Sequence, residues 1–196
     1  VMRISFSGEL AYEINIEANY GRYIWDEVAL AGKPWNITPY GTESMHVLRA
    51  EKGYIIVGQD TDGSMTPMDV NMKWILAKDK PFSYIGRRSF SISALNSDDR
   101  FQLVGLLTKD AHVVLPEGSH IINNKGGSIG YVTSSYFSPI LRRSIAMAQL
   151  KGGLSKMTEI VLVKIVQEKQ GLKEIPCEVS SSVFYDIEGE KVDGNE

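Results

Sequence analysis

The chain has 196 residues, which is enough for one large domain or two small ones with a buried core. Its composition, 43% hydrophobic and 23% charged residues, excludes a disordered protein. The formal net charge of −3 and the lack of a basic run argue against a nucleic-acid-binding protein. The apolar runs are too short to span a bilayer. The only cysteine, Cys177, cannot form an internal disulfide, so we expect a buried structural thiol and a cytoplasmic protein.

The amino-terminal residues predict a strand. Apolar side chains at positions 10, 12, 14 and 16 alternate with polar ones, which is the period of a half-buried strand. Val1 opens directly into this strand-like sequence without a leader. We therefore expect the chain to be a piece of a longer protein.

Helical patterns follow. Asn19 is a suitable cap for a helix that runs to Gly32. Thr38-Pro39 starts a second helix, which Gly53 ends. Residues 58–63 are rich in turn formers, residues 74–77 predict a strand or a buried turn, and residues 85–95 predict a helix.

The polar break at residues 96–99 sets the expected domain boundary. Residues 1–96 form an α+β part, and residues 97–196 form an all-β domain with an acidic, loose tail after Tyr185. Short strands at regular spacing predict a small antiparallel barrel or sandwich. These strands are expected at residues 101–108, 119–122, 128–133, 144–150, 159–166 and 175–179.

Several kinds of site are not supported. The three histidines, His46, His112 and His120, lack metal-ligand spacing, so no metal site is predicted. The glycines of residues 126–130 precede a predicted strand rather than a helix, which indicates a hairpin and not a dinucleotide-binding loop. No serine lies in a Gly-x-Ser-x-Gly turn, so a hydrolase triad lacks its nucleophile.

Glu9 is the most interesting polar residue. It follows Gly8 at the head of a predicted strand, where backbone can approach a flat ligand closely. Glu13 falls on the polar face, opposite Tyr12 and Ile14, and is the weaker candidate. From the residues alone, Glu9 can equally be an exposed turn carboxylate, and Arg49 can be a cation favoured by a helix dipole.

The order of motifs resembles the glycine-cleavage T-protein family. Residues 3–13 resemble that family's Gly-Tyr-Thr-Gly-Glu segment, with Ser5, Phe6 and Ser7 where Gly, Tyr and Thr usually stand. Further motifs follow in the family's order along nearly the whole chain, at residues 31–34, 39–43, 48–53, 66–69, 85–87, 132–134 and 138–141. The resemblance implies a T-protein-like fold.

Within this family, the sequence is most similar to the alpha subunits of heterotetrameric sarcosine oxidases. Residues 38–53 and 57–63 and the ending at residues 183–189 carry this similarity. It implies an oxidoreductase complex in which tetrahydrofolate accepts a one-carbon unit from sarcosine. The expected partners are the other subunits, including a flavin-bearing beta subunit, with no nucleic acid and no membrane.

The resemblance also implies roles for three residues. Glu9 would accept paired hydrogen bonds from the pterin ring, Phe6 would pack against that ring, and Arg49 would support the pterin edge or the inner carboxylate geometry. The family's acid–base aspartate would lie before Val1, so no catalytic residue is expected in this chain. Flavin and NAD would be bound elsewhere in the complex, and the isolated chain is predicted to be inactive.

Two alternatives remain open. The first is an aminomethyltransferase of glycine cleavage, which would use a lipoyl-carrier substrate. The second is a non-enzymatic folate-binding accessory protein of iron–sulfur assembly. The second group carries a cysteine in a Lys-Gly-Cys motif, whereas residues 52–54 here read Lys-Gly-Tyr, which counts against it.

Overall fold

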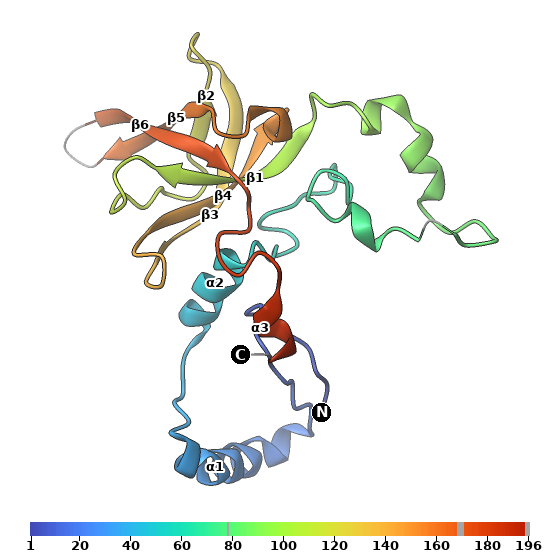
Figure 1. Cartoon of the computed structure of the whole chain (residues 1–196), viewed down its shortest axis with the longest axis vertical. Coiled ribbons are helices and arrows are strands. Elements are labelled where there is room, and N and C mark those ends of the chain that lie inside the picture. The colour runs from blue at the N-terminus through green and yellow to red at the C-terminus, as the bar shows by residue number, and fades with distance from the viewer. Residues whose placement is uncertain (78, 168–170, 195–196) are drawn as a thin grey trace.

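The structure, a computed structural model, describes residues 1–77, 79–167 and 171–194 (Figure 1). Two helices precede a barrel of strands, and a short third helix follows it. The helices are α1 (Gly21–Gly32), α2 (Thr42–Glu51) and α3 (Glu190–Asp193). The strands are β1 (Phe101–Thr108), β2 (His120–Ile122), β3 (Ser128–Ser138), β4 (Arg143–Lys151), β5 (Ile160–Gln167) and β6 (Gly171–Ser180).

The strands close into an antiparallel barrel in the order β1-β4-β3-β2-β5-β6. Alternate residues fill its interior, among them Val104 and Leu106 of β1, both fully buried. Cys177 is also buried there, and burial raises the pKa of its thiol to about 12. The predicted barrel is confirmed, although β3 and β6 are longer than expected. The division into domains at residues 96 and 97 stays a prediction.

Residues 123–127 form the predicted hairpin between β2 and β3. The amide of Gly126 donates to the carbonyl of Asn123 at 2.8 Å, and Gly126 has a φ of 78°. A left-handed φ suits glycine, which has no side chain to clash there. The glycine-rich stretch therefore makes a turn that leads directly into β3.

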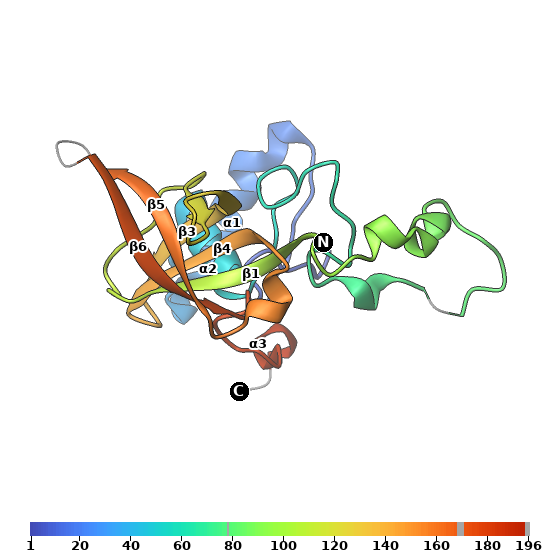
Figure 2. The same ribbon diagram turned by 90° about the horizontal axis from the view of Figure 1, so that it is seen from above.

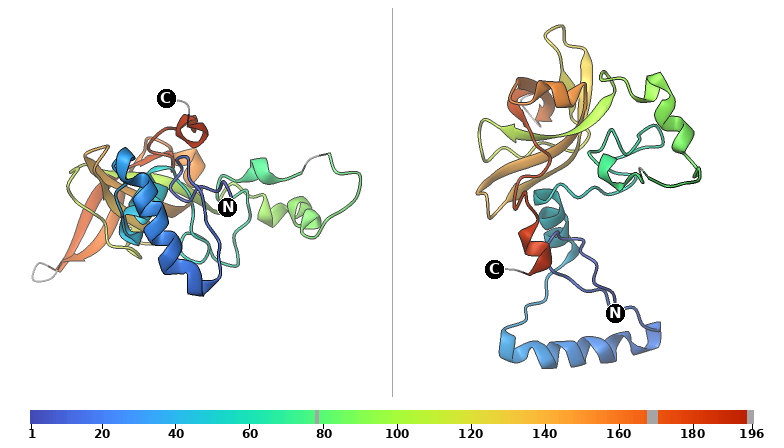
Figure 3. Two further views of the ribbon diagram at one scale, coloured as in Figure 1. Left: turned by 90° about the horizontal axis from the view of Figure 1, so that it is seen from below. Right: turned by 45° about the vertical axis from the view of Figure 1, so that its right-hand side comes forward.

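A second apolar cluster joins α2 to the outside of the barrel. Ala50 of α2 packs there with Leu103 of β1 and with Ile145 and Met147 of β4. Figure 3 shows α2 directly against the barrel, with α1 farther away. Figure 2 shows the segment between α2 and β1 extending to one side. The α2 helix is therefore the element that links the amino-terminal part to the barrel.

The predicted amino-terminal strand is wrong. Residues 10–17 make a single bridge, in which Met2 and Glu13 exchange backbone hydrogen bonds of 2.9 and 2.8 Å. Tyr12 and Ile14 remain 61% and 46% exposed. A sheet needs a continuous pairing partner, and among the described residues this segment makes only the Met2 bridge and one hydrogen bond from Leu10 to Lys191.

The helix α1 ends at Gly32 as predicted, but its N-cap is Tyr20 and not Asn19, and no side chain caps it. The helix α2 begins at Thr42 rather than at Pro39. The hydroxyl of Thr38 donates to the carbonyl of Asn36 instead of capping a helix. Gly53, with a φ of 68°, ends the helical turn as predicted.

Two further local predictions need correction. Trp74 lies in a short 3-10 turn and is 77% exposed, so residues 74–77 are neither a strand nor a buried turn. Residues 85–95 form two 3-10 helices, Arg87–Ser91 and Ser93–Leu95, in place of one α-helix. Both lie in the segment that extends away from the barrel, where little packing selects a regular α-helix.

Candidate functional site

Glu9 lies in a tight turn that its neighbours fix. The amide of Gly8 donates to the hydroxyl of Ser5 at 2.9 Å, and that hydroxyl donates to the carbonyl of Glu9. Gly8 has a φ of 81° and packs on the side chain of Lys52, since a Cβ added to Gly8 would lie 2.2 Å from its Cγ. Only glycine fits here, and the half-buried Glu9 is held directly beside this contact.

Phe6 belongs to the same turn-rich segment. Its side chain is 38% exposed, so much of it remains available to a ligand. A partly exposed ring can present an apolar face to a flat partner. The sequence therefore brings Phe6 and Glu9 into one short segment.

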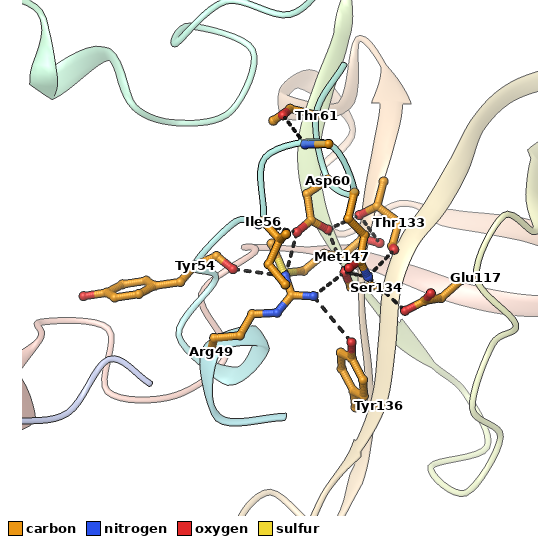
Figure 4. A network of polar contacts seen from close by, with 12 residues as sticks. Arg49, Tyr54, Ile56, Asp60, Thr61, Glu117, Thr133, Ser134, Tyr136 and Met147 are labelled. Carbon is orange, nitrogen blue, oxygen red and sulfur yellow. Dashed lines mark hydrogen bonds and ion pairs between the residues drawn. The ribbon is translucent and has the colours of Figure 1, made fainter. Parts of the chain in front are cut away.

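Arg49 lies elsewhere, inside the interface between α2 and the barrel (Figure 4). It is fully buried and donates to the carboxylate of Asp60 at 2.6 Å and to the hydroxyl of Ser134 at 2.7 Å. A third bond of 3.1 Å reaches the carbonyl of Tyr54, and the ring of Tyr136 lies beside the guanidinium. No hydrogen bond or ion pair joins Arg49 to Glu9 within the described residues.

Asp60 is the other half of this buried pair. It accepts hydrogen bonds from the amide of Ile56 at 2.8 Å and from the hydroxyls of Thr133 at 2.6 Å and Ser134 at 2.7 Å. A charge removed from water is tolerated only with such complete pairing. The pair therefore fixes α2 and the turn of residues 58–63 onto β3.

A second group of charges lies at the end of α2, next to the Glu9 turn. Glu51 is 3% exposed and accepts a hydrogen bond from the hydroxyl of Ser138. Burial raises the pKa of Glu51, the bond from Ser138 opposes this effect, and the charge of Glu9 adds to it. Lys52 pairs with Asp186 at 2.5 Å, and both side chains are nearly buried. This pairing lowers the pKa of Asp186.

A cavity of about 460 Å³ opens beside the same helix end. Its lining includes Lys52, Tyr54, Asn71, Trp74 and Val183. This volume is typical of small-molecule sites, and an aromatic wall with a few polar groups suits a planar ligand. Lys52 contributes to the cavity and also supports Gly8, so the Glu9 turn and the cavity share one residue.

Within the described residues, no three metal-ligating side chains gather at one point. In the same part of the chain, no helix combines the length and the apolar character that crossing a membrane requires.

Comparison with protein families matches both parts of the chain. Residues 1–80 match the GCVT N-terminal domain, and residues 102–186 match the glycine cleavage T-protein C-terminal barrel domain. The chain belongs to the glycine-cleavage T-protein family. The second match covers most of the barrel described above.

Individual relatives in the T-protein family agree with this assignment. Sarcosine oxidase subunit alpha from Corynebacterium sp. (strain P-1) is 44% identical over 99% of this chain and 20% of its own length. The Rhizobium meliloti (strain 1021) subunit is 36% identical over 98% of this chain and also 20% of its own length. Aminomethyltransferase from Synechococcus sp. (strain CC9311) is 30% identical over 93% of this chain and 46% of its own length.

A solved structure shows the same fold. Glycine cleavage system aminomethyltransferase T from Bartonella henselae superposes with a TM-score of 0.80, at 24% identity, over 94% of this chain and 49% of that chain. The T-protein-like fold inferred from the sequence motifs is thus confirmed. The chain spans 20% of the length of the alpha subunits that it matches and 46% of the Synechococcus aminomethyltransferase.

Sequence reasoning missed three residues around the candidate site. Asp60 was part of a stretch expected only to turn, and Lys52 and Asp186 were not candidates. Asp60 pairs with a residue 11 positions away, but Lys52 and Asp186 are 134 positions apart. The polar, turn-forming residues around Asp60 gave no sign that this carboxylate is buried and paired.

Proposed function

We propose that this chain is the folate-binding part of a sarcosine oxidase alpha subunit. In the whole protein, tetrahydrofolate would accept the one-carbon unit from the oxidative demethylation of sarcosine. The products would be glycine, methylene-tetrahydrofolate or formaldehyde, and hydrogen peroxide. The 44% identity along nearly the entire chain supports this proposal over other members of the family.

The observation that carries the proposal is the fixed turn around Glu9. A carboxylate held at a set angle can accept two parallel N–H bonds, one from a ring nitrogen and one from an amino group. The turn fits such a ligand because Glu9 is half-buried and its backbone is anchored by Ser5 and Lys52. Phe6, in the same segment, would pack against the pterin ring.

Arg49 has a supporting part in this proposal. Its two terminal nitrogens donate to Asp60, Ser134 and Tyr54, and its Nε is buried without a hydrogen-bond partner among the described residues. Arg49 would therefore act from behind the site rather than at the ligand's edge. By fixing α2 on the barrel, it would hold Lys52 beneath the Glu9 turn.

The remaining chemistry is assigned to other parts of the assembly. Removal of a hydride from an amine needs an electron acceptor, because side chains cannot accept a hydride. A flavin on the beta subunit would fill that role, with NAD bound by another portion of the complex. We therefore propose that the chain is inactive by itself and that the complex works in the cytoplasm.

Aminomethyl transfer in glycine cleavage is the second candidate function. It is favoured by the 30% identity to the Synechococcus aminomethyltransferase over 93% of this chain. Folate binding by Glu9 is common to both candidates. Transfer from an aminomethyl group on a lipoyl carrier, measured in the full-length protein, would favour the second candidate, whereas oxidation of sarcosine would favour the first.

The substitution Glu9→Gln tests the proposal. It keeps the size of the side chain but removes the charge and one acceptor, so tetrahydrofolate binding should weaken by about 1.5–3 kcal/mol. Calorimetry on the intact protein measures this change. Sarcosine oxidation should change little, because its chemistry lies elsewhere.

Glu13→Gln is the matched control for this test. Glu13 is exposed, and its contact with Met2 uses only backbone atoms. It should therefore leave folate affinity unaltered. An unchanged affinity in Glu9→Gln would return Glu9 to an ordinary turn carboxylate.

A further inference from the structure

Residues 186–194 lie against the Glu9 turn, whereas the acidic composition after Tyr185 predicts a loose tail. Asp186 pairs with Lys52, the segment forms α3, and the carbonyl of Lys191 accepts a hydrogen bond of 2.9 Å from the amide of Leu10. Arg3 donates to the carbonyl of Val192 at 2.9 Å. Figure 3 shows α3 beside the amino-terminal segment.

These contacts form a closed ring of residues that starts at Gly8, ends at Leu10 and so includes Glu9. Gly8 packs on the side chain of Lys52, and the ammonium of Lys52 bonds to both the carboxylate and the carbonyl of Asp186. The carboxylate of Asp186 accepts a hydrogen bond of 3.2 Å from the amide of Lys191, and the carbonyl of Lys191 accepts one from the amide of Leu10. Leu10 is therefore bonded directly to residues 186–194, and Gly8 is linked to them through Lys52.

Asp186 connects the two sides of this ring. It has a φ of 48°, a left-handed conformation that few residues other than Gly, Asn and Asp adopt readily. From there its carboxylate reaches Lys52 on one side and the amides of Glu190 and Lys191 on the other. Such a conformation persists only where the surrounding contacts hold it.

We propose that Asp186 is a positioning residue, which closes the segment of residues 186–194 around the Glu9 turn and so sets the affinity for tetrahydrofolate. This inference rests on the proposed function, because it assigns the ligand to Glu9. Positioning has a direct benefit here, since a carboxylate held in its binding geometry loses less freedom when the ligand binds. The proposal gives the carboxy-terminal segment a part in ligand binding without any contact to the ligand.

The test uses Asp186→Asn in the intact protein. Asparagine tolerates the left-handed conformation but removes the charge that holds Lys52. Tetrahydrofolate affinity should fall by roughly tenfold, the lower end of what the loss of a charged hydrogen bond costs. Asp193→Asn is the matched control, because it makes the same change within residues 186–194, at a side chain that is 70% exposed and whose pair with Arg3 is exposed as well. It should leave the affinity within twofold of the wild type, roughly the limit for surface changes.

A double-mutant cycle separates positioning from a merely structural role. If Asp186 acts through Glu9, then Asp186→Asn should weaken binding little further in a Glu9→Gln background. Equal fold losses in both backgrounds would show that Asp186 acts independently of Glu9 and would overturn the proposal.

Amide hydrogen exchange measures the ring without any ligand. Exchange at Leu10 should accelerate in Asp186→Asn and in a chain ending at Glu188, but not in Asp193→Asn. An exchange rate at Leu10 equal to that of the wild type in the first two variants would show that Asp186 does not hold Leu10 in place. This result would overturn the proposal whatever the folate affinity is. Unchanged folate affinity in Glu9→Gln, with accelerated exchange in Asp186→Asn, would instead overturn the folate assignment and with it the positioning role.

Discussion

The barrel and the amino-terminal segment bury their apolar side chains to very different extents. In β4, residues 144–150 are all buried, whereas α1 has no buried residue within its bounds. Trp25 and Leu30 of α1 are 59% and 58% exposed. Figure 1 shows α1 at the end of the molecule opposite the barrel.

The difference shows that the two regions are stabilised by different interactions. The barrel depends on apolar burial within a closed ladder of backbone hydrogen bonds. Residues 1–10 are instead attached by a few hydrogen bonds, to Glu13 and to the carboxy-terminal segment, and by the packing of Gly8 on the side chain of Lys52. The candidate site lies where the regions meet, so substitutions on either side of this junction should have unequal effects.

Arg49→Met should have the largest effect on stability. It leaves the carboxylate of Asp60 buried without its cation, which costs about 3–5 kcal/mol. Urea denaturation monitored by circular dichroism measures the free energy of unfolding.

The matched control for Arg49→Met is Arg22→Met in α1. Arg22 pairs with Asp26 at 2.7 Å, but the two side chains are 86% and 54% exposed. An exposed pair of this kind contributes at most about 0.5 kcal/mol. Equal losses of the free energy of unfolding in the two variants would contradict the contrast between the barrel and the amino-terminal segment.

Substitutions of two leucines compare the two regions without changing any charge. Leu106→Ala opens a cavity in the barrel interior, where Leu106 is fully buried, and should cost about 2–5 kcal/mol. Leu30→Ala in α1 should stay within about 0.5 kcal/mol, as surface changes do. The same denaturation experiment applies, and a loss above 2 kcal/mol in Leu30→Ala would mean that α1 is packed in solution.

Local sequence patterns predicted the barrel well because its short strands follow one another at regular spacing and are bounded by turn residues. The alternation at residues 10–17 predicted a strand that does not form, since a strand needs a continuous pairing partner. The described residues supply only isolated contacts there, from Met2 to Glu13 and from Lys191 to Leu10. Around the site, the turn of Gly8 and Glu9 was visible in the sequence. Its supports were not, because pairs such as Lys52 and Asp186 form only through the tertiary fold.

Glu51→Gln should have the smallest effect of these substitutions, and its sign should depend on pH. Burial raises the pKa of Glu51 above its ordinary value of 4.5, although Ser138 opposes this and Glu9 adds to it. A raised pKa means that the folded state prefers the protonated acid, so the contribution of Glu51 to the free energy of unfolding is fully present below pH 4.5. Its contribution is lost as the pH rises through the folded pKa.

Glutamine mimics the protonated acid at every pH and can still accept the bond from Ser138. The variant should therefore match the wild type near pH 4 and become the more stable of the two as the pH approaches neutrality. Denaturation at several pH values measures the difference, in which the contributions of all other acids cancel. A difference that stays constant or shrinks with rising pH would show that the junction between α2 and the barrel accommodates a charged Glu51 at no cost.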